Sequence, residues 1–457
     1  MIRILNAYYP TRTLVLLLCE AMLIVAAFLA ATIMLVGPDT YIALVYQSGT
    51  LKILCICVFT LLLSYYFDLY EPQRISMNWE IHFRLLLVLS ALSFSLATLV
   101  YFFPKIEIGP HVLASGIAIL AVMLLLWRSA YERIIAWPIF RERVYVLGNA
   151  QRAHAIESLL RSRRDLGMEV VRGMLSDSST GGTDPFAEDL HGFDTPKIGI
   201  DRIIVALEDR RGSMPVQELL ALRLRGVVIE ESGALLERLS GMLPLDGLNP
   251  SALIFTHGFN TRPSLQFGRR LFSITVSSVA LAICLPLLPF LILAVRLSSP
   301  GPIFFRQVRV GFRGRPFTIY KFRTMRLDAE ANGAVWATKN DPRITPLGRF
   351  MRKTRLDEIP QLWNVLRGDM GFVGPRPERP EFVQWLVKEI PYYNLRHMIR
   401  PGLTGWAQVR YQYGASLEET KRKLEYDLYY IKHLSLGLDL LIMFETVKTI
   451  LLRRGAQ

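Results

Sequence analysis

Four long apolar stretches in the first third of the chain constrain its fold more than any other feature. They cover residues 14–36, 41–67, 85–103 and 112–127. Each meets the requirement of about 20 apolar residues for a helix that crosses a bilayer. The first is too long for the apolar part of a signal peptide, and no cleavage pattern follows it. The sequence predicts four membrane spans here, with buried core helices as the alternative.

The composition agrees with a membrane protein that handles anions. The chain has 457 residues, 51% of them hydrophobic, and a mean hydropathy of +0.30, which is too apolar for a purely soluble enzyme. Its net charge of +14 suits anionic lipid headgroups and phosphate substrates. No nucleic-acid motif and no stripe of basic and aromatic residues occurs, so a nucleic-acid partner is not expected. The cysteines lie inside apolar segments, without spacing for zinc or disulfides: Cys19, Cys55, Cys57 and Cys284.

The basic residues around the four stretches predict their orientation. They flank the first stretch, mark the second connection and follow the fourth stretch: Arg3, Arg12, Arg74, Arg84, Arg128, Arg133, Arg141 and Arg143. The first and third connections carry only Lys105. Because basic residues collect on the cytoplasmic side, the N-terminus and everything after residue 140 should lie in the cytoplasm.

Residues 141–260 are soluble in character and alternate between strand-like and helix-like runs. A strand at 144–148 precedes a helical run at 150–164, and further apolar runs lie at 170–175, 203–207 and 227–229. This alternation predicts a small Rossmann-like α/β domain with a parallel sheet, interrupted by a polar loop at 177–184. Only Gly148 fits the dinucleotide fingerprint, so a redox cofactor is not expected. A regulatory or assembly role is favoured, and nucleotide sensing is the alternative.

A fifth apolar run, residues 271–297, is long enough to cross the bilayer but should not do so. Basic residues flank both of its ends: Arg269, Arg270 and Arg296. Pro286 and Pro289 each remove a helix hydrogen bond, and together they can bend the segment back to its entry face. We therefore predict a re-entrant membrane helix that is broken at these two prolines.

Two adjacent carboxylates in the last third are the first candidate catalytic residues. Asp357 and Glu358 come just before Pro360, which suits the first turn of a helix. The helix dipole and nearby cationic side chains, among them Arg352, favour the ionised carboxylates. An ionised, partly desolvated Asp can act as a nucleophile or hold a hard cation such as magnesium. A solvated capping cluster is the alternative.

Two proline- and glycine-rich motifs follow the carboxylates. In Gly374-Pro375-Arg376-Pro377, the prolines restrict the backbone around Arg376, whose planar fork matches two phosphate oxygens. The alternative is a rigid surface turn. In the 401–406 segment, two glycines would let backbone N–H groups approach a ligand closely. Trp406 would either stack on a base or sugar or be a buried structural residue.

Three weaker candidates complete the set. Lys321 and Arg323 alternate with apolar residues after a strand-like run at 316–320, which puts both cations on one strand face. A solvated strand face would show the same alternation. Asp427 lies among helix formers, where an ion pair with a neighbouring Lys or Arg is the common role of an aspartate.

Four separated motifs resemble those of the bacterial sugar transferases, the polyprenyl-phosphate hexose-1-phosphate transferases. The resemblance runs from about Arg269 to the C-terminus and includes YKFRTM (320–325), LDE with GPRP (356–377) and RPGLTGWAQV (400–409). Large members of this family are similar in having four spans and a Rossmann-like domain before the catalytic part. The resemblance implies a membrane helical bundle at 1–140, an α/β domain at 141–260 and a mainly α (α+β) catalytic domain at 261–457.

The resemblance also implies a two-step reaction. Asp357 would attack the sugar-linked phosphate of a UDP-sugar and release UMP, and polyprenyl (undecaprenyl) phosphate would then displace Asp357. Magnesium held partly by Asp357 would offset phosphate charge. Glu358 would assist as a base or metal-site partner, and Arg352 and Arg376 would hold phosphates. Lys321, Arg323 and Asp427 are further phosphate-site candidates.

The product would start an exopolysaccharide or surface-glycan repeat unit at the bacterial inner membrane, with the catalytic domain in the cytoplasm. Further partners considered are membrane lipids, a second copy of the chain and polysaccharide-assembly proteins. Two other functions remain open at this point. A membrane glycosyltransferase would move the sugar alone and release UDP, and a non-catalytic assembly protein would show no turnover.

Overall fold

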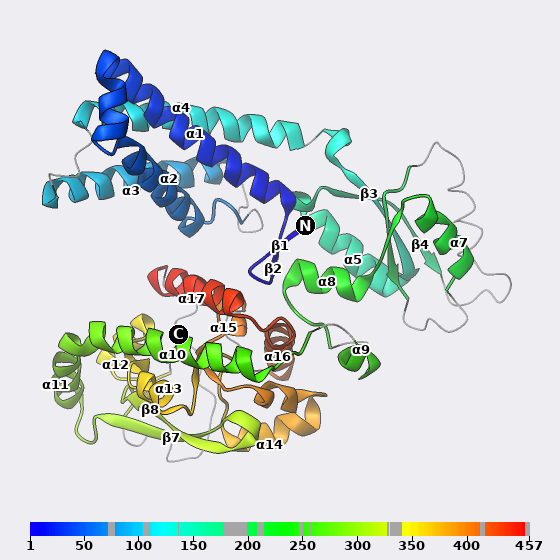
Figure 1. Ribbon diagram of the computed structural model, residues 1–457. Coiled ribbons are helices and arrows are strands. Elements are labelled where there is room, and N and C mark those ends of the chain that lie inside the picture. Colours follow the sequence, from blue (N-terminus) through cyan, green and yellow to red (C-terminus); the bar gives the residue numbers. More distant parts are fainter. Residues whose placement is uncertain are drawn as a thin grey trace. The chain divides into compact units, whose positions relative to one another are not determined.

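The computed structural model describes residues 1–71, 78–103, 109–135, 137–176, 199–207, 214–245, 250–255, 258–326, 329, 341–411 and 416–452 (Figure 1). The described chain is mostly helical, with apolar helices near the N-terminus and mixed helices and strands in the C-terminal region. Contacts divide it into two compact units, Met1–Ile2 with Tyr9–Ser232 (unit 1) and Arg3–Tyr8 with Gly233–Gln457 (unit 2).

Unit 1 begins with the four predicted apolar helices. They are α1 (Thr11–Val36), α2 (Gly49–Tyr66), α3 (Asn78–Phe102) and α4 (Pro110–Ile135). All four are long and apolar enough to cross a membrane. The helix predicted from residue 41 begins later, at Gly49. The chain before it forms a separate turn at Ile42–Tyr46, and Ser48 takes a left-handed conformation (φ 57°) that no continuous helix can contain.

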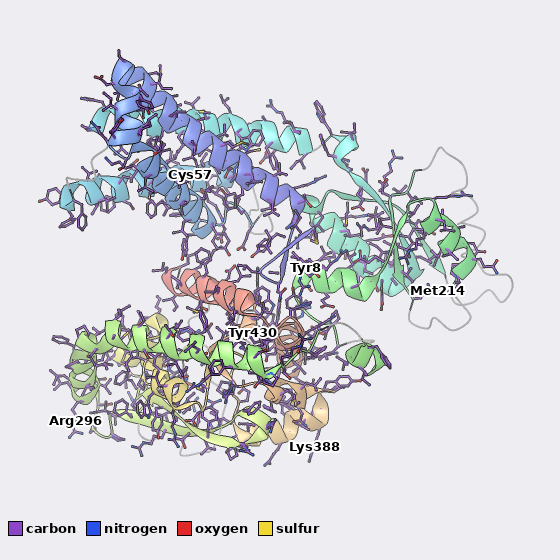
Figure 2. The ribbon with its side chains drawn as sticks, in the orientation of Figure 1. Tyr8, Cys57, Met214, Arg296, Lys388 and Tyr430 are labelled. Carbon is purple, nitrogen blue, oxygen red and sulfur yellow. The ribbon has the colours of Figure 1, made fainter. Side chains whose placement is uncertain are left out.

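The helices of this bundle pack closely and bury a charged group. A Cβ at Gly116 of α4 would lie 2.6 Å from the Phe28 ring of α1, so the glycine allows the two helices to approach. Glu20 of α1 forms a 2.5 Å ion pair with Arg128 of α4, and both are buried. Ionisable residues in such segments are expensive unless they are paired. All four cysteines are free thiols, and Cys57 is buried in the bundle (Figure 2).

The second part of unit 1 is a four-stranded parallel sheet. Its strands are β3 (Glu142–Asn149), β4 (Met168–Ser176), β5 (Arg202–Ala206) and β6 (Val228–Glu231), in the order β4-β3-β5-β6. The helices α5 (Ala150–Ser162) and α7 (Val216–Leu224) connect them. This confirms the parallel α/β pattern. A Cβ at Gly148 would lie 2.6 Å from the carbonyl oxygen of Ala206, so this glycine serves strand packing. The polar loop at 177–184 lies outside the described residues.

Unit 2 carries the motifs. Its first elements are α8 (Ser232–Ser240, in unit 2 from Gly233), α9 (Pro250–Phe255), α10 (Pro263–Cys284), η7 (Leu285–Leu287) and α11 (Leu288–Ser298). The antiparallel strands β7 (Phe304–Val310) and β8 (Pro316–Phe322) follow, then α12 (Pro346–Thr354), η9 (Leu356–Glu358) and α13 (Gln361–Arg367). The remainder is β9 (Gly371–Val373), α14 (Pro380–Glu389), η10 (Tyr393–Met398), β10 (Gly402–Thr404), α15 (Trp406–Arg410), α16 (Leu417–Lys432) and α17 (Leu436–Leu451).

Two segments that lie before residue 260 in sequence pack on α16 within unit 2. Glu237 of α8 forms 2.7 Å ion pairs with Lys432 and His433. The N-terminal turn between β1 (Ile2–Ile4) and β2 (Ala7–Tyr9) contributes Asn6, whose amide donates to the His433 carbonyl at 3.0 Å. The domain boundaries at 140 and 260 stay predictions, and the contact-based units divide the chain at Ser232.

Candidate functional site

The carboxylate pair lies in a tight turn between two helices. Arg355 ends α12 in a left-handed conformation (φ 59°), and Asp357 and Glu358 occupy the single 3-10 turn that follows. Pro360 then precedes the first residue of α13. Asp357 and Glu358 therefore lie just before a helix, as the sequence predicts. A left-handed arginine is uncommon, and it turns the chain sharply enough to direct both carboxylates into the protein.

Glu358 is surrounded by cationic side chains. Its Oε1 accepts from Arg376 at 2.8 Å and from Lys321 at 3.3 Å, and Arg355 lies at 3.6 Å. Burial favours its neutral form, but the charges of Arg376, Lys321 and Arg355 outweigh burial and hold the pKa of Glu358 well below its ordinary value. The carboxylate of Glu358 thus favours the ionised form and orients the predicted phosphate-binding groups Lys321 and Arg376.

Asp357 has a different environment although it is the adjacent residue. Its side chain is 6% exposed, and its Oδ1 is buried without a hydrogen-bond partner in the described part of the chain. Burial, with the neighbouring charge of Glu358, raises the pKa of Asp357 to about 6, against the opposing charges of Lys321 and Arg352. At neutral pH it is an ionised carboxylate with an unpaired oxygen, which is the state that nucleophilic attack requires.

A buried asparagine that the sequence analysis missed aligns β8 with the carboxylate turn. Asn364 of α13 is fully buried and donates to the Thr318 carbonyl at 2.7 Å, while its own oxygen accepts from the Tyr320 backbone at 3.1 Å. These two hydrogen bonds fix β8 next to α13 and so position Lys321 beside Glu358. The sequence feature that could have identified Asn364 is a polar residue on the apolar face of a short helix, because buried polar groups are normally hydrogen-bonded.

The two other predicted arginines lie on either side of Thr324. Arg352 of α12 donates through Nε to the Thr324 hydroxyl at 2.9 Å, and its charge lowers the pKa of Asp357. Arg323 donates through Nη2 to the carbonyl of Ser299 at 2.6 Å and to its hydroxyl at 2.9 Å. The predicted shared face of Lys321 and Arg323 does not persist, because β8 ends at Phe322. The two cations bond to different elements.

Asp427 lies behind the proline-flanked arginine. It forms a 2.9 Å ion pair with Arg396, whose Nη2 also donates to the Arg376 carbonyl at 2.9 Å. Burial raises the pKa of Asp427 to about 6 although Arg396 opposes the shift. Asp427 therefore supports the backbone of Arg376 through Arg396. Arg396 was missed because it lies outside the recognised motifs.

The glycines of the two loop motifs serve backbone packing. A Cβ at Gly374 would lie 2.4 Å from the Arg400 carbonyl, and one at Gly405 would lie 2.2 Å from the Gly374 carbonyl. The N–H of Gly374 donates to Thr404 and that of Gly402 to Pro375. The hypothesis that the glycines of the 401–406 segment open backbone N–H groups to a ligand is wrong for Gly402, since the Pro375 carbonyl already accepts from its N–H, and it stays a prediction for Gly405.

Trp406 is a buried structural residue, the second of its two predicted roles. It is 2% exposed, its Nε1 donates to the Gly241 carbonyl at 2.7 Å, and its ring stacks on Tyr429 with centroids 5.9 Å apart. Arg410 lies over the same ring at 4.5 Å. No face of the indole is left for a base or sugar.

The donor set around Asp357 fits a hard cation in one specific way. No cluster of three or more His, Cys, Asp or Glu suited to a metal occurs within the described ranges. Asp357 nevertheless keeps an unpaired Oδ1. Magnesium is often held by one or two carboxylates together with substrate phosphates and water. Asp357 therefore fits as a single protein ligand whose remaining partners would come from the substrate.

Comparison with known proteins places the C-terminal part of the chain in one protein family. Residues 264–453 match the family model described as bacterial sugar transferase. An Aeromonas hydrophila protein, UDP-N-acetylgalactosamine-undecaprenyl-phosphate N-acetylgalactosaminephosphotransferase, is 39% identical over 58% of this chain and 63% of its own length. The UDP-glucose:undecaprenyl-phosphate glucose-1-phosphate transferases of Escherichia coli K12 and Caulobacter vibrioides are 42% and 39% identical, over 39% and 46% of this chain.

These matches differ in how much of each relative they cover. The match includes 79% of the Caulobacter vibrioides protein but 39% of the Escherichia coli protein. The chain therefore spans about two fifths to two thirds of the two larger relatives named above. The names of the relatives also differ in their sugar, N-acetylgalactosamine or glucose.

Proposed function

This chain is a member of the bacterial sugar transferase family, and we propose that it transfers a sugar 1-phosphate from a UDP-sugar to polyprenyl phosphate, with release of UMP. The observation that carries this proposal is the unpaired Oδ1 of Asp357 beside the cations that Glu358 orients. A transferase that moves the sugar alone and releases UDP would not need a buried nucleophile.

In the first step, a carboxylate oxygen of Asp357 attacks the phosphorus that carries the sugar. The bond from this phosphorus to the oxygen bridging to UMP breaks, and UMP leaves with the bond electrons. Lys321 and Arg376, held by Glu358, stabilise the charge that develops on the phosphate oxygens. Arg352 adds positive charge near Asp357.

In the second step, an oxygen of the lipid phosphate attacks the same phosphorus. The bond between this phosphorus and Asp357 breaks, and the carboxylate is restored. The product is a lipid-linked sugar diphosphate, which we propose starts a surface-glycan or exopolysaccharide unit. Bound magnesium would neutralise phosphate charge, with Asp357 as its protein ligand.

We also propose that α10 and α11 form a re-entrant membrane helix. A straight helix over the 36 residues Pro263–Ser298 would extend about 54 Å, well beyond the hydrocarbon thickness of about 30 Å. Instead, η7 at Pro286 interrupts it, and α11 leaves the line of α10 (Figure 1). Both ends bond to other elements of unit 2: Arg269 pairs with Asp439 of α17 at 2.7 Å, and Ser299 accepts from Arg323. These contacts support a return to the entry face, which would be the cytoplasmic face of the inner membrane.

Cysteine labelling tests this topology. Ser264 and Ser298 are exposed at the two ends of the segment and would each be replaced by cysteine in a chain without native cysteines. We expect both sites to be protected from an impermeant thiol reagent in intact cells and to become labelled after permeabilisation. Labelling of only one of them in intact cells would refute the re-entrant helix.

The proposed reaction is tested by its nucleotide product. The purified chain in lipid nanodiscs would be incubated with undecaprenyl phosphate, magnesium and either UDP-glucose or UDP-N-acetylgalactosamine, the donors named for its relatives. We expect UMP and a lipid-linked sugar diphosphate. UDP in place of UMP would refute the phosphoglycosyl transfer, and absence of turnover with a wider panel of UDP-sugars would favour a non-catalytic assembly role.

A further inference from the structure

Arg323 is a buried cation whose charge is not balanced within the described part of the chain. Its side chain is 7% exposed, and its Nη2 donates to the carbonyl and hydroxyl oxygens of Ser299. Its Nε and Nη1 are buried without an acceptor among the residues that the structure describes. An unpaired buried charge costs several kcal/mol, so such a group usually has an anionic partner in the functional state.

Two cations near the carboxylate turn, Lys321 and Arg376, differ from Arg323 in this respect. Glu358 already accepts from both Lys321 and Arg376, so one anion partly offsets the charge of each. Arg323 forms no such pair among the described residues. Lys321 and Arg376 are thus oriented by a protein carboxylate, whereas Arg323 has no anionic partner within the described part of the chain.

The position of Arg323 indicates where its anion would come from. Ser299 directly follows α11, whose side chains Phe290, Leu293 and Leu297 are exposed and apolar. On the other side, Lys321 and Thr324 connect the same short segment to Glu358 and Arg352. Arg323 therefore lies between the end of the broken membrane helix and the residues around Asp357.

We propose that Arg323, oriented by Ser299, binds the phosphate of the lipid acceptor, whereas Lys321 and Arg376 serve the phosphates of the nucleotide donor. This inference rests on the proposed function and deepens it, because it gives donor and acceptor separate cationic groups. A phosphate monoester on a long isoprenoid chain combines the charge that Arg323 lacks with the apolar tail that suits α11.

The two half-reactions separate these roles. The full chain in phosphatidylcholine nanodiscs would first receive UDP-sugar and magnesium without acceptor, and the adduct on Asp357 would be quantified by intact mass together with released UMP. Undecaprenyl phosphate would then be added at a series of concentrations, and the rate of adduct loss would be measured. The variants are Arg323→Gln, Arg323→Lys and Ser299→Ala. Arg296→Gln is the matched control, because Arg296 is an exposed cation at the same end of α11 (Figure 2).

We expect Arg323→Gln to form the adduct at a rate within about twofold of the wild type. Its half-saturating acceptor concentration should rise about tenfold or more, since a charged hydrogen bond is lost. Arg323→Lys should recover part of this loss, and Ser299→Ala should show a rise of about threefold because only one of two oxygens is removed. Arg296→Gln should match the wild type in both steps.

Equal slowing of adduct formation and transfer in Arg323→Gln would overturn the proposal, and so would no change in either. If Arg323→Gln does not fold, wild-type acceptor saturation in both Arg323→Lys and Ser299→Ala would overturn it. Failure of the wild type to form any adduct or UMP would instead refute the proposed function. A final comparison replaces part of the phosphatidylcholine with phosphatidylglycerol. A transfer defect that appears only with phosphatidylglycerol would show that Arg323 binds bulk lipid headgroups, against the proposal.

Discussion

The surroundings of Asp357 and of Asp427 in unit 2 make an instructive pair. Both carboxylates are buried, at 6% and 2% exposure, and burial raises the pKa of each to about 6. Each has one buried carboxylate oxygen without a well-aligned hydrogen bond among the described residues, but that oxygen of Asp427, Oδ2, forms a 2.9 Å ion pair with Arg396, whereas Oδ1 of Asp357 forms no ion pair there. A raised pKa therefore does not by itself identify a nucleophile. The availability of an oxygen next to oriented cations distinguishes the two sites.

The largest expected effect is the loss of the covalent intermediate when Asp357 is replaced, with no such loss when Asp427 is replaced. Asp357→Asn should reduce adduct formation and UMP release by about a thousandfold or more, because an amide is a poor nucleophile. Asp427→Asn should still form the adduct, and peptide mapping should place it on Asp357. Glu358→Gln should slow both events without abolishing them. An adduct on Asp427, or on the Asp357→Asn protein, would break the comparison.

A smaller effect should follow from removal of the supporting ion pair. Asp427→Asn leaves Arg396 buried without its counter-charge and loosens the Arg376 backbone that Arg396 holds. We expect kcat/KM for the donor to fall about tenfold, with a lower Tm, because breaking a buried pair costs about 3–5 kcal/mol. The control is Glu381→Gln, which removes an exposed partner of Arg379 and should change Tm little. Equal Tm shifts in the two variants would contradict a supporting role for Asp427.

The pH dependence of adduct formation should belong to Asp357 alone. Its pKa of about 6 means that the nucleophilic carboxylate is protonated as pH falls. The rate should decrease about tenfold for each pH unit below 6 and level off above 7. Asp427→Asn should keep this profile, although Asp427 has a similar pKa. A profile that flattens in Asp427→Asn would assign the titration to the other carboxylate.

The smallest expected effect concerns stability, and it has opposite signs at two aspartates. The folded pKa of Asp357 lies above the ordinary value of 3.8, so its charge destabilises the fold at pH above about 6, and this cost disappears as pH falls to 3.8. Asp341 accepts from the Arg343 side chain, which lowers its pKa to about 2, so its charge stabilises the fold above pH 3.8 and this gain is lost as pH falls to about 2.

At pH 8, Asp357→Asn should therefore raise Tm by about 2–4 °C, and Asp341→Asn should lower it by a similar amount. The gain for Asp357→Asn should shrink at pH 5. Thermal unfolding of the detergent-solubilised chain would measure both shifts. Tm shifts of the same sign in both variants would contradict the opposite contributions of these two charges to stability.

Local chemistry in the sequence determined much of the architecture. Long apolar runs require helices in a membrane because backbone groups there must be paired internally, and the alternation after residue 141 was sufficient to predict the parallel sheet. The position of Asp357 and Glu358 just before a helix also followed from Pro360. These features depend on short-range rules, so one sequence was enough to predict them.

Only the tertiary structure decided which candidate residues meet. Lys321 and Arg376 both pair with Glu358, Arg323 bonds to Ser299, and Asp427 is linked to Arg376 through Arg396. The same long-range packing buried Trp406 and closed the glycine-rich loops on each other. A sequence motif shows which charged and polar side chains a site can contain. Whether a charge is paired or left without a partner depends on contacts between segments far apart in the chain, and no local pattern encodes their geometry.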